Sequence, residues 1–215
     1  MKILHILCAT LMAVAFVSCD EHRDFPDTSM KTCDILCTDG KVVRFEDVKS
    51  QNKTPIAVVF YVNQNEDIQG TGYAVYLKDI EPYVYSDSLG LKHNTSADIT
   101  AFDGNGNTHA MYSTGTSPAA SAVFDMWQYG QSVYIPSVAQ IKLLYEARSA
   151  VNTYIRKCGG DELLDNPDEC WYWTSTEVKG LETAKAWLFS LASGALQETP
   201  KTQAHKVRPI ITLYN

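Results

Sequence analysis

Histidine, serine and carboxylate side chains are the usual carriers of enzymatic chemistry, and their spacing in this chain matches no common catalytic pattern. The sequence contains no G-x-S-x-G, H-E-x-x-H or phosphate-binding Gly-Lys loop. Four histidines beyond the N-terminal apolar segment are scattered without a partner nucleophile: His22, His93, His109 and His205. The residues give no positive evidence for an enzyme, and we expect no catalytic residues and no cofactor.

The run from Asp103 to Asn107 reads Asp-Gly-Asn-Gly-Asn and has the alternating oxygen ligands of a calcium-binding loop. An EF-hand loop has glycine at its sixth position and glutamate at its twelfth, where this chain has Thr108 and Thr114. The run therefore fails the test for that motif. We expect a turn-rich loop there and no metal site.

The N-terminus has the pattern of a secretory signal, because Lys2 is followed by an almost uninterrupted apolar run over residues 3–17. This run is too short to span a bilayer comfortably. The sequence Phe16-Val17-Ser18-Cys19 resembles the lipobox of bacterial lipoproteins, in which the thiol is acylated and the signal is removed. The resemblance implies lipidation of Cys19, and a plain secretory signal is the alternative.

The acidic pair Asp20-Glu21 follows at once. It resembles the export signal that sends lipoproteins of anaerobic Gram-negative gut bacteria to the outer face of the outer membrane, and a solvated linker is the alternative. We expect a signal peptide over residues 1–18, a tether over 19–32 and a single domain over 33–215. The implied location is the bacterial outer membrane, with the domain facing the cell exterior and acyl chains as the membrane contact.

Four of the six cysteines remain once Cys8 leaves with the signal and Cys19 is acylated. An oxidising envelope allows three pairings among four cysteines. Local pairing is our prediction: Cys33 with Cys37, and Cys158 with Cys170, the second loop contributing roughly 3 kcal/mol in the chain-entropy model. A zinc site is the alternative, disfavoured because C-x2-C spacing and nearby histidines are lacking.

Short strands are predicted at both ends of the domain. Residues 56–62 form an apolar, β-branched run, and residues 72–77 have the pattern of its hairpin partner. Residues 81–116 are rich in Gly, Asn, Asp, Ser and Tyr, which favours surface loops with short strands. Later strands are predicted at 171–176, 186–191 and 207–213.

Two helices are predicted between these groups of strands. Ser117-Pro118 places a capping hydroxyl before a proline at the first helical position, with Ala122, Val123, Met126 and Trp127 on one face. In the second helix, Ser137 and Gln140 form a capping box and Gly159-Gly160 ends the helix. Its apolar stripe comprises Val138, Ile141, Leu144, Tyr145, Val151 and Ile155.

This order of elements indicates an α+β domain rather than alternating βαβ units. The chain has 215 residues, of which 45% are hydrophobic and 20% charged. These values fit one globular domain and exclude collagen, a coiled coil and a disordered chain. A net charge of −7 argues against nucleic acid as a partner, because phosphates attract clustered Lys and Arg.

Several motifs between residues 134 and 210 follow the order of one known family: Tyr134-Ile135-Pro136-Ser137, Gln140-Ile141, Leu144-Tyr145, Gly159-Gly160, Tyr172-Trp173-Thr174-Ser175-Thr176-Glu177, Ala186-Trp187 and Val207-Arg208-Pro209-Ile210. The set resembles the lectin-like domain at the C-terminus of a bacterial collagen-like adhesin and in many surface lipoproteins. The resemblance implies a C-type-lectin-like fold, related to the formylglycine-generating-enzyme superfamily. Such a fold has mostly antiparallel short strands, paired N- and C-terminal strands, two flanking helices and long binding loops.

The chain departs from the calcium-dependent lectins of this fold, because it has Asn166-Pro167-Asp168 but no Trp-Asn-Asp. Calcium-mediated sugar binding by that route is therefore not expected. We take five residues of the matched motifs as ligand-binding candidates: Tyr172, Trp173, Thr174, Trp187 and Arg208. The alternative is that Trp171, Trp173 and Trp187 belong to the core of the fold.

The function expected from these features is a non-catalytic, surface-anchored module that binds a glycan or a protein. A structural or accessory subunit of a cell-surface fibre or complex is the alternative. An enzyme of the formylglycine-generating branch is a third possibility, and it would need a reactive thiol.

Overall fold

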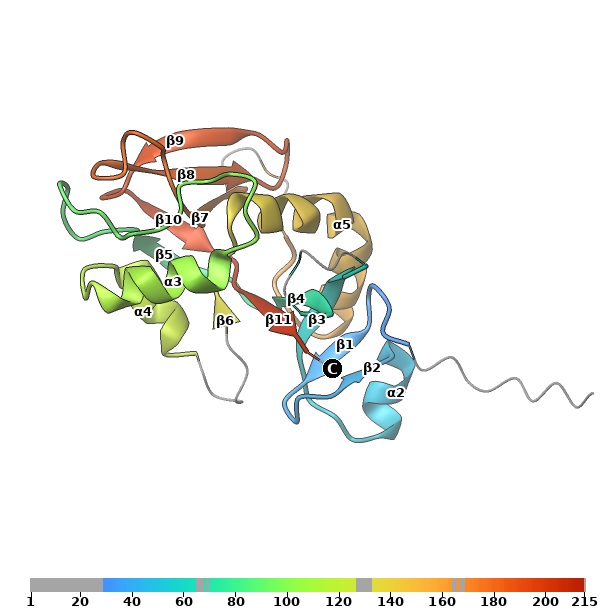
Figure 1. Ribbon diagram of the computed structural model, residues 1–215. Helices are drawn as coiled ribbons and strands as arrows, with labels where there is room; N and C mark the ends of the chain where they lie inside the picture. The colour runs from blue at the N-terminus through green and yellow to red at the C-terminus, as the bar shows by residue number, and fades with distance from the viewer. Residues whose placement is uncertain are drawn as a thin grey trace, which may run out of the picture.

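The computed structural model describes residues 29–64, 68, 70–126, 133–163, 166 and 169–214, which form two β-sheets and four helices (Figure 1). The predicted signal peptide, the acylation site Cys19 and the pair Asp20-Glu21 lie outside the described residues. So do the tether up to residue 28, Trp127, Pro167 and Asp168. In the described part of the chain, no helix has the length and apolar character needed to cross a membrane.

The first sheet has six strands, all antiparallel to their neighbours, in the order β2-β1-β3-β4-β11-β6. The strands are β1 (Ile35–Cys37), β2 (Val42–Val43), β3 (Pro55–Val62), β4 (Gly72–Tyr76), β6 (Val133–Tyr134) and β11 (Ile210–Leu213). The predicted hairpin is confirmed, because β3 pairs with β4. The last strand, β11, pairs with β4 and β6, and not with β1 or β3.

The second sheet has five strands in the order β5-β10-β7-β8-β9. They are β5 (Ile80–Val84), β7 (Trp171–Glu177), β8 (Lys185–Ser190), β9 (Leu196–Pro200) and β10 (Ala204–Val207). The neighbours run antiparallel except β10 and β7, which are parallel and meet at Lys206 and Tyr172. The long sequence separation between β7 and β10 makes this parallel pairing possible, because a tight turn cannot join parallel strands.

Helix α5 (Val138–Lys157) begins at the predicted capping box. Ser137 Oγ accepts from the Gln140 N–H at 3.4 Å, and Gln140 Oε1 accepts from the Ser137 N–H at 3.0 Å. Five of the six predicted stripe residues are buried, and Tyr145 is half-buried. The helix ends at Lys157, and Cys158 after it is followed by Gly159 with φ +73°, a conformation that glycine adopts without a steric penalty.

The other helices are shorter: α2 (Phe45–Ser50), α3 (Gly104–Ser113) and α4 (Pro118–Phe124). Helix α4 starts as predicted, with Ser117 Oγ accepting from the Ala120 N–H. Helix α3 corrects the prediction of a loop at Asp103 to Asn107. Its glycines and Asn favour turns, but Thr108 and Met111 are buried against neighbouring elements, so tertiary packing overrides the local preference.

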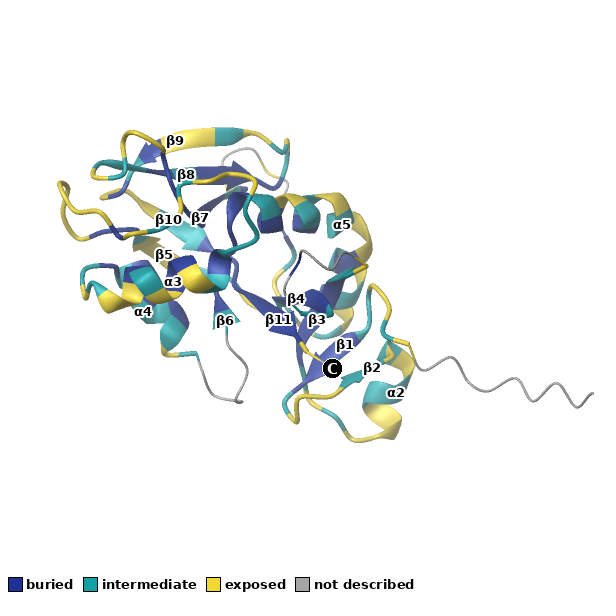
Figure 2. Cartoon of the chain, viewed as in Figure 1, coloured by how far each residue is buried: buried dark blue, intermediate teal, exposed yellow. Residues whose placement is uncertain are grey.

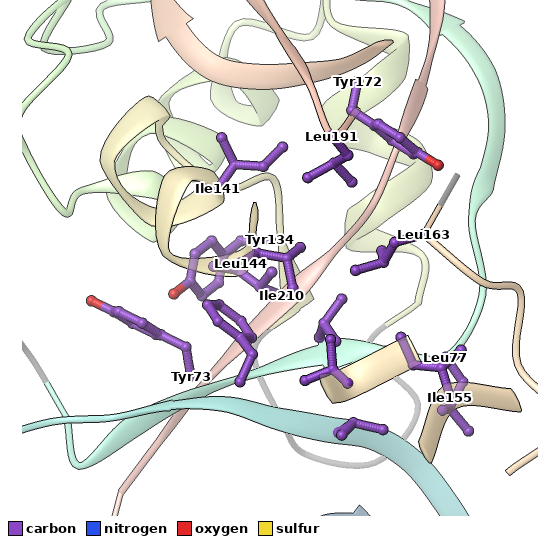
Figure 3. Close-up of a cluster of buried hydrophobic side chains, with 14 of the residues drawn as sticks. Tyr73, Leu77, Tyr134, Ile141, Leu144, Ile155, Leu163, Tyr172, Leu191 and Ile210 are labelled. Carbon is purple, nitrogen blue, oxygen red and sulfur yellow. The ribbon is translucent and has the colours of Figure 1, made fainter. Parts of the chain in front are cut away.

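The main core draws side chains from both sheets and from α5 (Figure 3). Ile141 and Leu144 of α5 pack with Tyr134 and Ile210 of the first sheet. Tyr172 of the second sheet lies at the edge of this cluster in Figure 3, with its hydroxyl turned outward.

Strand β3 has apolar side chains on both faces, since Val58 and Phe60 enter this core while Ala57 and Val59 enter a second cluster. Burial on both faces explains the unbroken apolar run that predicted the strand.

The architecture is therefore α+β with mostly antiparallel strands, as predicted from the sequence. Figure 2 shows the buried strands β3, β4 and β11 at the centre and the exposed middle of β9 at a sheet edge. Residues 86–103 form a long irregular segment before α3, consistent with the predicted surface loops.

Candidate functional site

The five predicted ligand-contact residues lie in the second sheet and directly after it. Tyr172, Trp173 and Thr174 belong to β7, Trp187 belongs to β8, and Arg208 follows β10. All but Trp187 are fully buried. The structure brings Tyr172 and Arg208 together, because both contact the carboxylate of Asp79 in the turn between β4 and β5.

Asp79 is held by contacts from two directions. The Tyr172 hydroxyl donates to Asp79 Oδ2 at 3.1 Å, and Arg208 Nε lies 2.9 Å from Asp79 Oδ1. The Arg208 contact is a close ion pair without hydrogen-bond alignment, because neither atom has a hydrogen-bond partner. The Arg208 guanidinium instead donates to the carbonyls of Tyr76 and Asp161. This buried arginine therefore joins β4, the segment after α5 and the turn that carries Asp79.

The electrostatics of this ion pair reflect its burial. Burial raises the pKa of the Asp79 carboxyl, although the nearby charges of Arg208 and Lys206 act to lower it. Burial likewise lowers the pKa of the Arg208 guanidinium, and the Asp79 charge partly offsets that effect. Both directions follow from the cost of holding a charge away from water.

A pocket of about 250 Å³ opens beside Asp79. Its walls are residues 79–82, the pair Asp161 and Glu162 after α5, and Lys206 of β10. Lys206 Nζ lies 3.8 Å from Asp79 Oδ2. Because β10 pairs with both β5 and β7, the sheet itself places Lys206 beside the turn that precedes β5.

The rim of the pocket is fixed by further charged pairs. Lys78 Nζ donates to Asp161 Oδ1 at 2.9 Å, and Asp161 Oδ2 accepts from the Asp79 N–H at 3.2 Å. Arg156 in the last turn of α5 donates to both carboxylate oxygens of Glu162, at 2.6 and 2.8 Å. These contacts join the end of the helix to the β4–β5 turn.

Sequence reasoning missed Asp79, Glu81, Asp161 and Lys206. The available signal was positional, because Asp79 follows a predicted strand and Asp161 follows the Gly159-Gly160 helix stop. Charged residues are common at the ends of strands and helices, so their positions alone do not predict a pocket. Lys206 comes beside Asp79 through the pairing register of β10 with β5, which the sequence does not reveal.

The remaining candidates are engaged inside the fold. Trp173 Nε1 donates to the Tyr83 carbonyl at 2.9 Å, and its ring meets those of Tyr85 and His205 edge-on. Thr174 Oγ1 donates to the Trp187 carbonyl at 2.8 Å. Trp187 is half-buried and does not line the pocket. These positions agree with the alternative that the tryptophans pack in the fold; ligand contact by them remains a prediction.

A second polar cluster lies under the 86–103 segment. Lys201 and Glu177 form an ion pair in which neither side chain is more than 1% exposed. Lys201 Nζ also donates to His93 Nδ1 at 3.0 Å and to the Leu91 carbonyl at 3.0 Å. Glu177 accepts from the backbone N–H of His93 at 2.8 Å.

This cluster fastens two loops to the sheet. Lys201 reaches the carbonyls of Leu91 and Glu182, and the Gly90 N–H donates to the Thr183 carbonyl at 2.8 Å. Burial by itself raises the pKa of Glu177, but hydrogen bonds from His93 and Lys201 outweigh it and hold the pKa at about 2. Glu177 is therefore an anion at neutral pH, and its hydrogen bonds tie the 86–103 segment to the sheet.

The structure contains neither of the predicted Cys33–Cys37 and Cys158–Cys170 bridges, because none of these four cysteines forms a disulfide. Cys37 Sγ is turned toward the Ile35 carbonyl, while Cys170 Sγ lies 3.2 Å from Ser190 Oγ of the neighbouring strand. The Cys37 and Cys170 thiols therefore each contact an oxygen atom rather than the predicted partner cysteine. Burial raises the pKa of the Cys33, Cys37 and Cys158 thiols, which disfavours the reactive thiolate.

Among the described residues, no group of three or more His, Cys, Asp and Glu side chains is arranged to hold a metal ion. Asp103, the first residue of the calcium-like run, is the residue before α3 and accepts from Asn107 Nδ2 at 2.7 Å.

No protein-family model and no curated protein matches this chain. Among solved structures, a fimbrial protein from Bacteroides ovatus superposes on it with a TM-score of 0.67 at 16% sequence identity. The match covers 86% of this chain and 49% of that protein, so the chain spans about half the length of the fimbrial protein. At this level of identity, the likeness shows that the two proteins share a fold.

Proposed function

We propose that this protein is a non-catalytic accessory or structural subunit of a cell-surface fibre or complex. The observation that carries the proposal is the fold shared with a fimbrial protein over 86% of this chain. The identity of 16% is too low to transfer a function by itself, so the remaining support comes from this chain's own surface and interior.

The burial of the predicted ligand-binding aromatic residues favours an assembly role over the binding of a ligand by exposed aromatic rings. Tyr172 and Trp173 both have a hydrogen-bond partner within the fold and are fully buried. A sugar-binding cleft built on these rings would need them accessible to solvent.

The exposed apolar side chains offer a surface for a protein partner. Leu89, Leu91 and Ile99 are 54%, 40% and 43% exposed, and all three lie in the 86–103 segment. Leu181, 41% exposed, lies in the turn that the Gly90–Thr183 bond holds beside this segment. Lys201 donates hydrogen bonds to the carbonyls of Leu91 and Glu182 and so holds both loops in place. Loops that are already ordered lose little conformational entropy on binding, which favours association with a partner.

The finer features of the prediction remain part of this proposal. A C-type-lectin-like fold is supported by the motif order and by the capped helix α5, whereas the expected pairing of the first and last strands is not seen, because β11 pairs with β4 and β6. Acylation at Cys19 and display on the outer face of the outer membrane are supported by the lipobox-like sequence and by Asp20-Glu21. An enzyme of the formylglycine-generating branch is not supported, because burial disfavours the thiolate of three of the four cysteines.

The proposal is tested in cells that produce the full chain. Labelled palmitate should enter the protein and should fail to enter a Cys19→Ala variant. Cross-linking of intact cells should place the wild-type chain in high-mass species together with other surface proteins. A chain that carries palmitate but stays a monomer after cross-linking would refute the assembly role.

A further inference from the structure

The pocket beside Asp79 has the size for one small molecule. Its volume of about 250 Å³ is slightly below the range of roughly 300–1,000 Å³ that is typical of sites for drug-sized ligands. Its walls come from residues 79–82, from the acidic pair after α5 and from β10, so the site forms only in the folded domain. The charges that line this space decide which kind of molecule it can hold.

Three of the four carboxylates in the pocket wall already have a close cationic partner. The pairs are Asp79 with Arg208, Asp161 with Lys78, and Glu162 with Arg156, with N–O distances of 2.6–2.9 Å. Because opposite charges cancel within each pair, these carboxylates attract a further charged group only weakly.

Glu81 and Lys206 are the two charges of the wall that these pairs leave over. Glu81 is exposed and forms no ion pair with any described residue. Lys206 Nζ lies 3.8 Å from Asp79 Oδ2, but the Asp79 carboxylate is already engaged by the closer Arg208 and by the Tyr172 hydroxyl. One carboxylate and one ammonium group therefore line the same cavity without forming an ion pair with each other.

This arrangement favours a ligand that carries both signs of charge. An ammonium group of the ligand would donate to the Glu81 carboxylate, and a carboxylate of the ligand would accept from the Lys206 ammonium, in charge-assisted hydrogen bonds. A ligand with a positive charge alone would be repelled by Lys206, and one with a negative charge alone would be repelled by Glu81. An uncharged ligand would displace water from both groups without replacing its interactions with charge.

The rest of the wall suits the carbon atoms of such a ligand. Ile80 and Pro82 add apolar surface to the same cavity, against which a small aliphatic group can be buried. An ammonium group, a carboxylate and a small aliphatic group on one carbon atom are the chemistry of an apolar α-amino acid.

The base of the pocket is held in place before any ligand arrives. The Asp79 carboxylate is oriented by the Tyr172 hydroxyl at 3.1 Å and by the fully buried Arg208 at 2.9 Å. The Asp79 N–H donates in turn to Asp161 Oδ2 at 3.2 Å, which joins two of the three stretches of the wall. A site that is ordered in this way loses little freedom when a ligand binds.

We propose that this pocket binds a free α-amino acid with a small aliphatic side chain, with Glu81 contacting its ammonium group and Lys206 its carboxylate. The proposal goes beyond the assembly role and does not depend on it, because the pocket residues are distinct from the exposed leucines of the 86–103 segment.

The test uses the full-length protein in detergent micelles at neutral pH and saturation-transfer NMR with L-valine and three comparison probes. L-Valinamide lacks the carboxylate, N-acetyl-L-valine lacks the ammonium group, and glucose carries no charge. We expect L-valine to bind with a dissociation constant of ~1 mM, because so small a ligand makes few contacts. Each comparison probe should bind about tenfold more weakly or worse, because it leaves at least one of the two charged groups without a partner.

Two variants assign the binding to this pocket, because each should change the ligand selectivity in a different way. Lys206→Met removes the partner of the ligand carboxylate, so L-valine and L-valinamide should bind equally well. Glu81→Gln removes the partner of the ligand ammonium group, so L-valine and N-acetyl-L-valine should bind equally well. A general loss of structure would instead weaken the binding of all probes alike.

The matched controls are Lys185→Met and Glu198→Gln, which break a partly exposed ion pair between β8 and β9. Both should leave the affinity and selectivity for L-valine unchanged. Circular dichroism should show the same fold for all four variants.

Absence of L-valine binding by the folded wild-type protein would overturn the proposal. Binding of L-valinamide, N-acetyl-L-valine or glucose as tightly as L-valine would overturn it as well. So would a wild-type selectivity that persists in Lys206→Met and Glu81→Gln. Each of these results leaves the assembly role standing, since cross-linking in cells reports on that role separately.

Discussion

At the scale of single residues, Lys201 and Glu177 bear opposite charges at positions where neither side chain is more than 1% exposed. A buried charge is tolerated when its hydrogen bonds are satisfied, and here His93 and the Leu91 carbonyl complete the set. Removing one member leaves the other as an uncompensated charge. Substitution of one member of this pair therefore tests whether the buried cluster anchors the 86–103 segment.

We expect Glu177→Gln to lower the free energy of unfolding by about 3–5 kcal/mol, because it strands the Lys201 ammonium in the interior. Urea denaturation followed by fluorescence measures this change. Glu198→Gln is the control, since its partner Lys185 is partly exposed and the loss should stay within about 1 kcal/mol. Equal losses in the two variants would show that the buried cluster does not anchor the loops.

The same cluster predicts how stability depends on acid. The pKa of Glu177 is about 2 in the folded protein, against about 4.3 in an unfolded chain. A lowered carboxyl pKa stabilises the fold above pH ~4.3, and this contribution disappears as the pH falls toward 2. Asp79, whose pKa is raised, acts in the opposite direction. The wild type should lose stability between pH 4.3 and 2 more steeply than Glu177→Gln, and parallel curves would contradict this assignment.

At the scale of elements, α3 shows how a poor helix sequence is made helical by its neighbours. The N–H of Gly104 donates to Gln140 Oε1 at 3.2 Å, so the capping residue of α5 also holds the start of α3. A Cβ at Gly104 would lie 2.7 Å from the Ile135 carbonyl oxygen and 2.8 Å from the Ser137 nitrogen. The close approach of α3 to the start of α5 therefore requires glycine at this position.

Two glycines in α3 provide a matched comparison. Gly104→Ala should destabilise the protein by about 1–3 kcal/mol, because the methyl group meets backbone atoms that cannot move aside. Gly106→Ala should stabilise it by about 0.5–1 kcal/mol, since nothing lies within 4 Å and alanine favours the helix. Thermal unfolding measures both changes, and a loss of stability in Gly106→Ala would contradict the reasoning.

Local signals predicted most elements whose cause is local. The capping box at Ser137, the cap at Ser117 and the apolar run of β3 each depend on residues close together in the chain. Helix α3 escaped prediction because it depends on packing against distant segments, and β1 escaped because it pairs with β3. The short edge strands β2 and β9 pair only with their neighbours in sequence, and so few residues carry too weak a pattern to predict a strand. Pairing order is a property of the whole chain, and no local pattern encodes the neighbours of β10.

Only part of the candidate site followed from the sequence. Tyr172 and Arg208 belong to the matched motifs and both contact Asp79, so their contacts are with protein atoms. Glu81 and Lys206, which line the pocket, carry no motif, and the register of β10 and β5 brings them together.

At the scale of the whole molecule, the exposed leucines of the fastened loops are the surface through which we expect assembly. Leu89→Asp combined with Leu181→Asp should remove the wild-type chain's cross-linked species while changing the unfolding midpoint little, because the two side chains are 54% and 41% exposed. Cross-linking in intact cells measures the first effect. Tyr214→Ser is the control, because it removes a side chain that is 61% exposed at the C-terminal end of the described residues, outside the 86–103 segment. Normal assembly by the leucine variant would exclude this surface.

The placement of β10 and β11 has a consequence for how the chain matures. Residues 204–213 supply a strand between β5 and β7 and another between β4 and β6, so both sheets stay open until these residues arrive. During synthesis from the N-terminus, neither sheet can be completed until these last strands have been made. A chain that ends before residue 204 would lack both strands, and we expect it to be strongly destabilised.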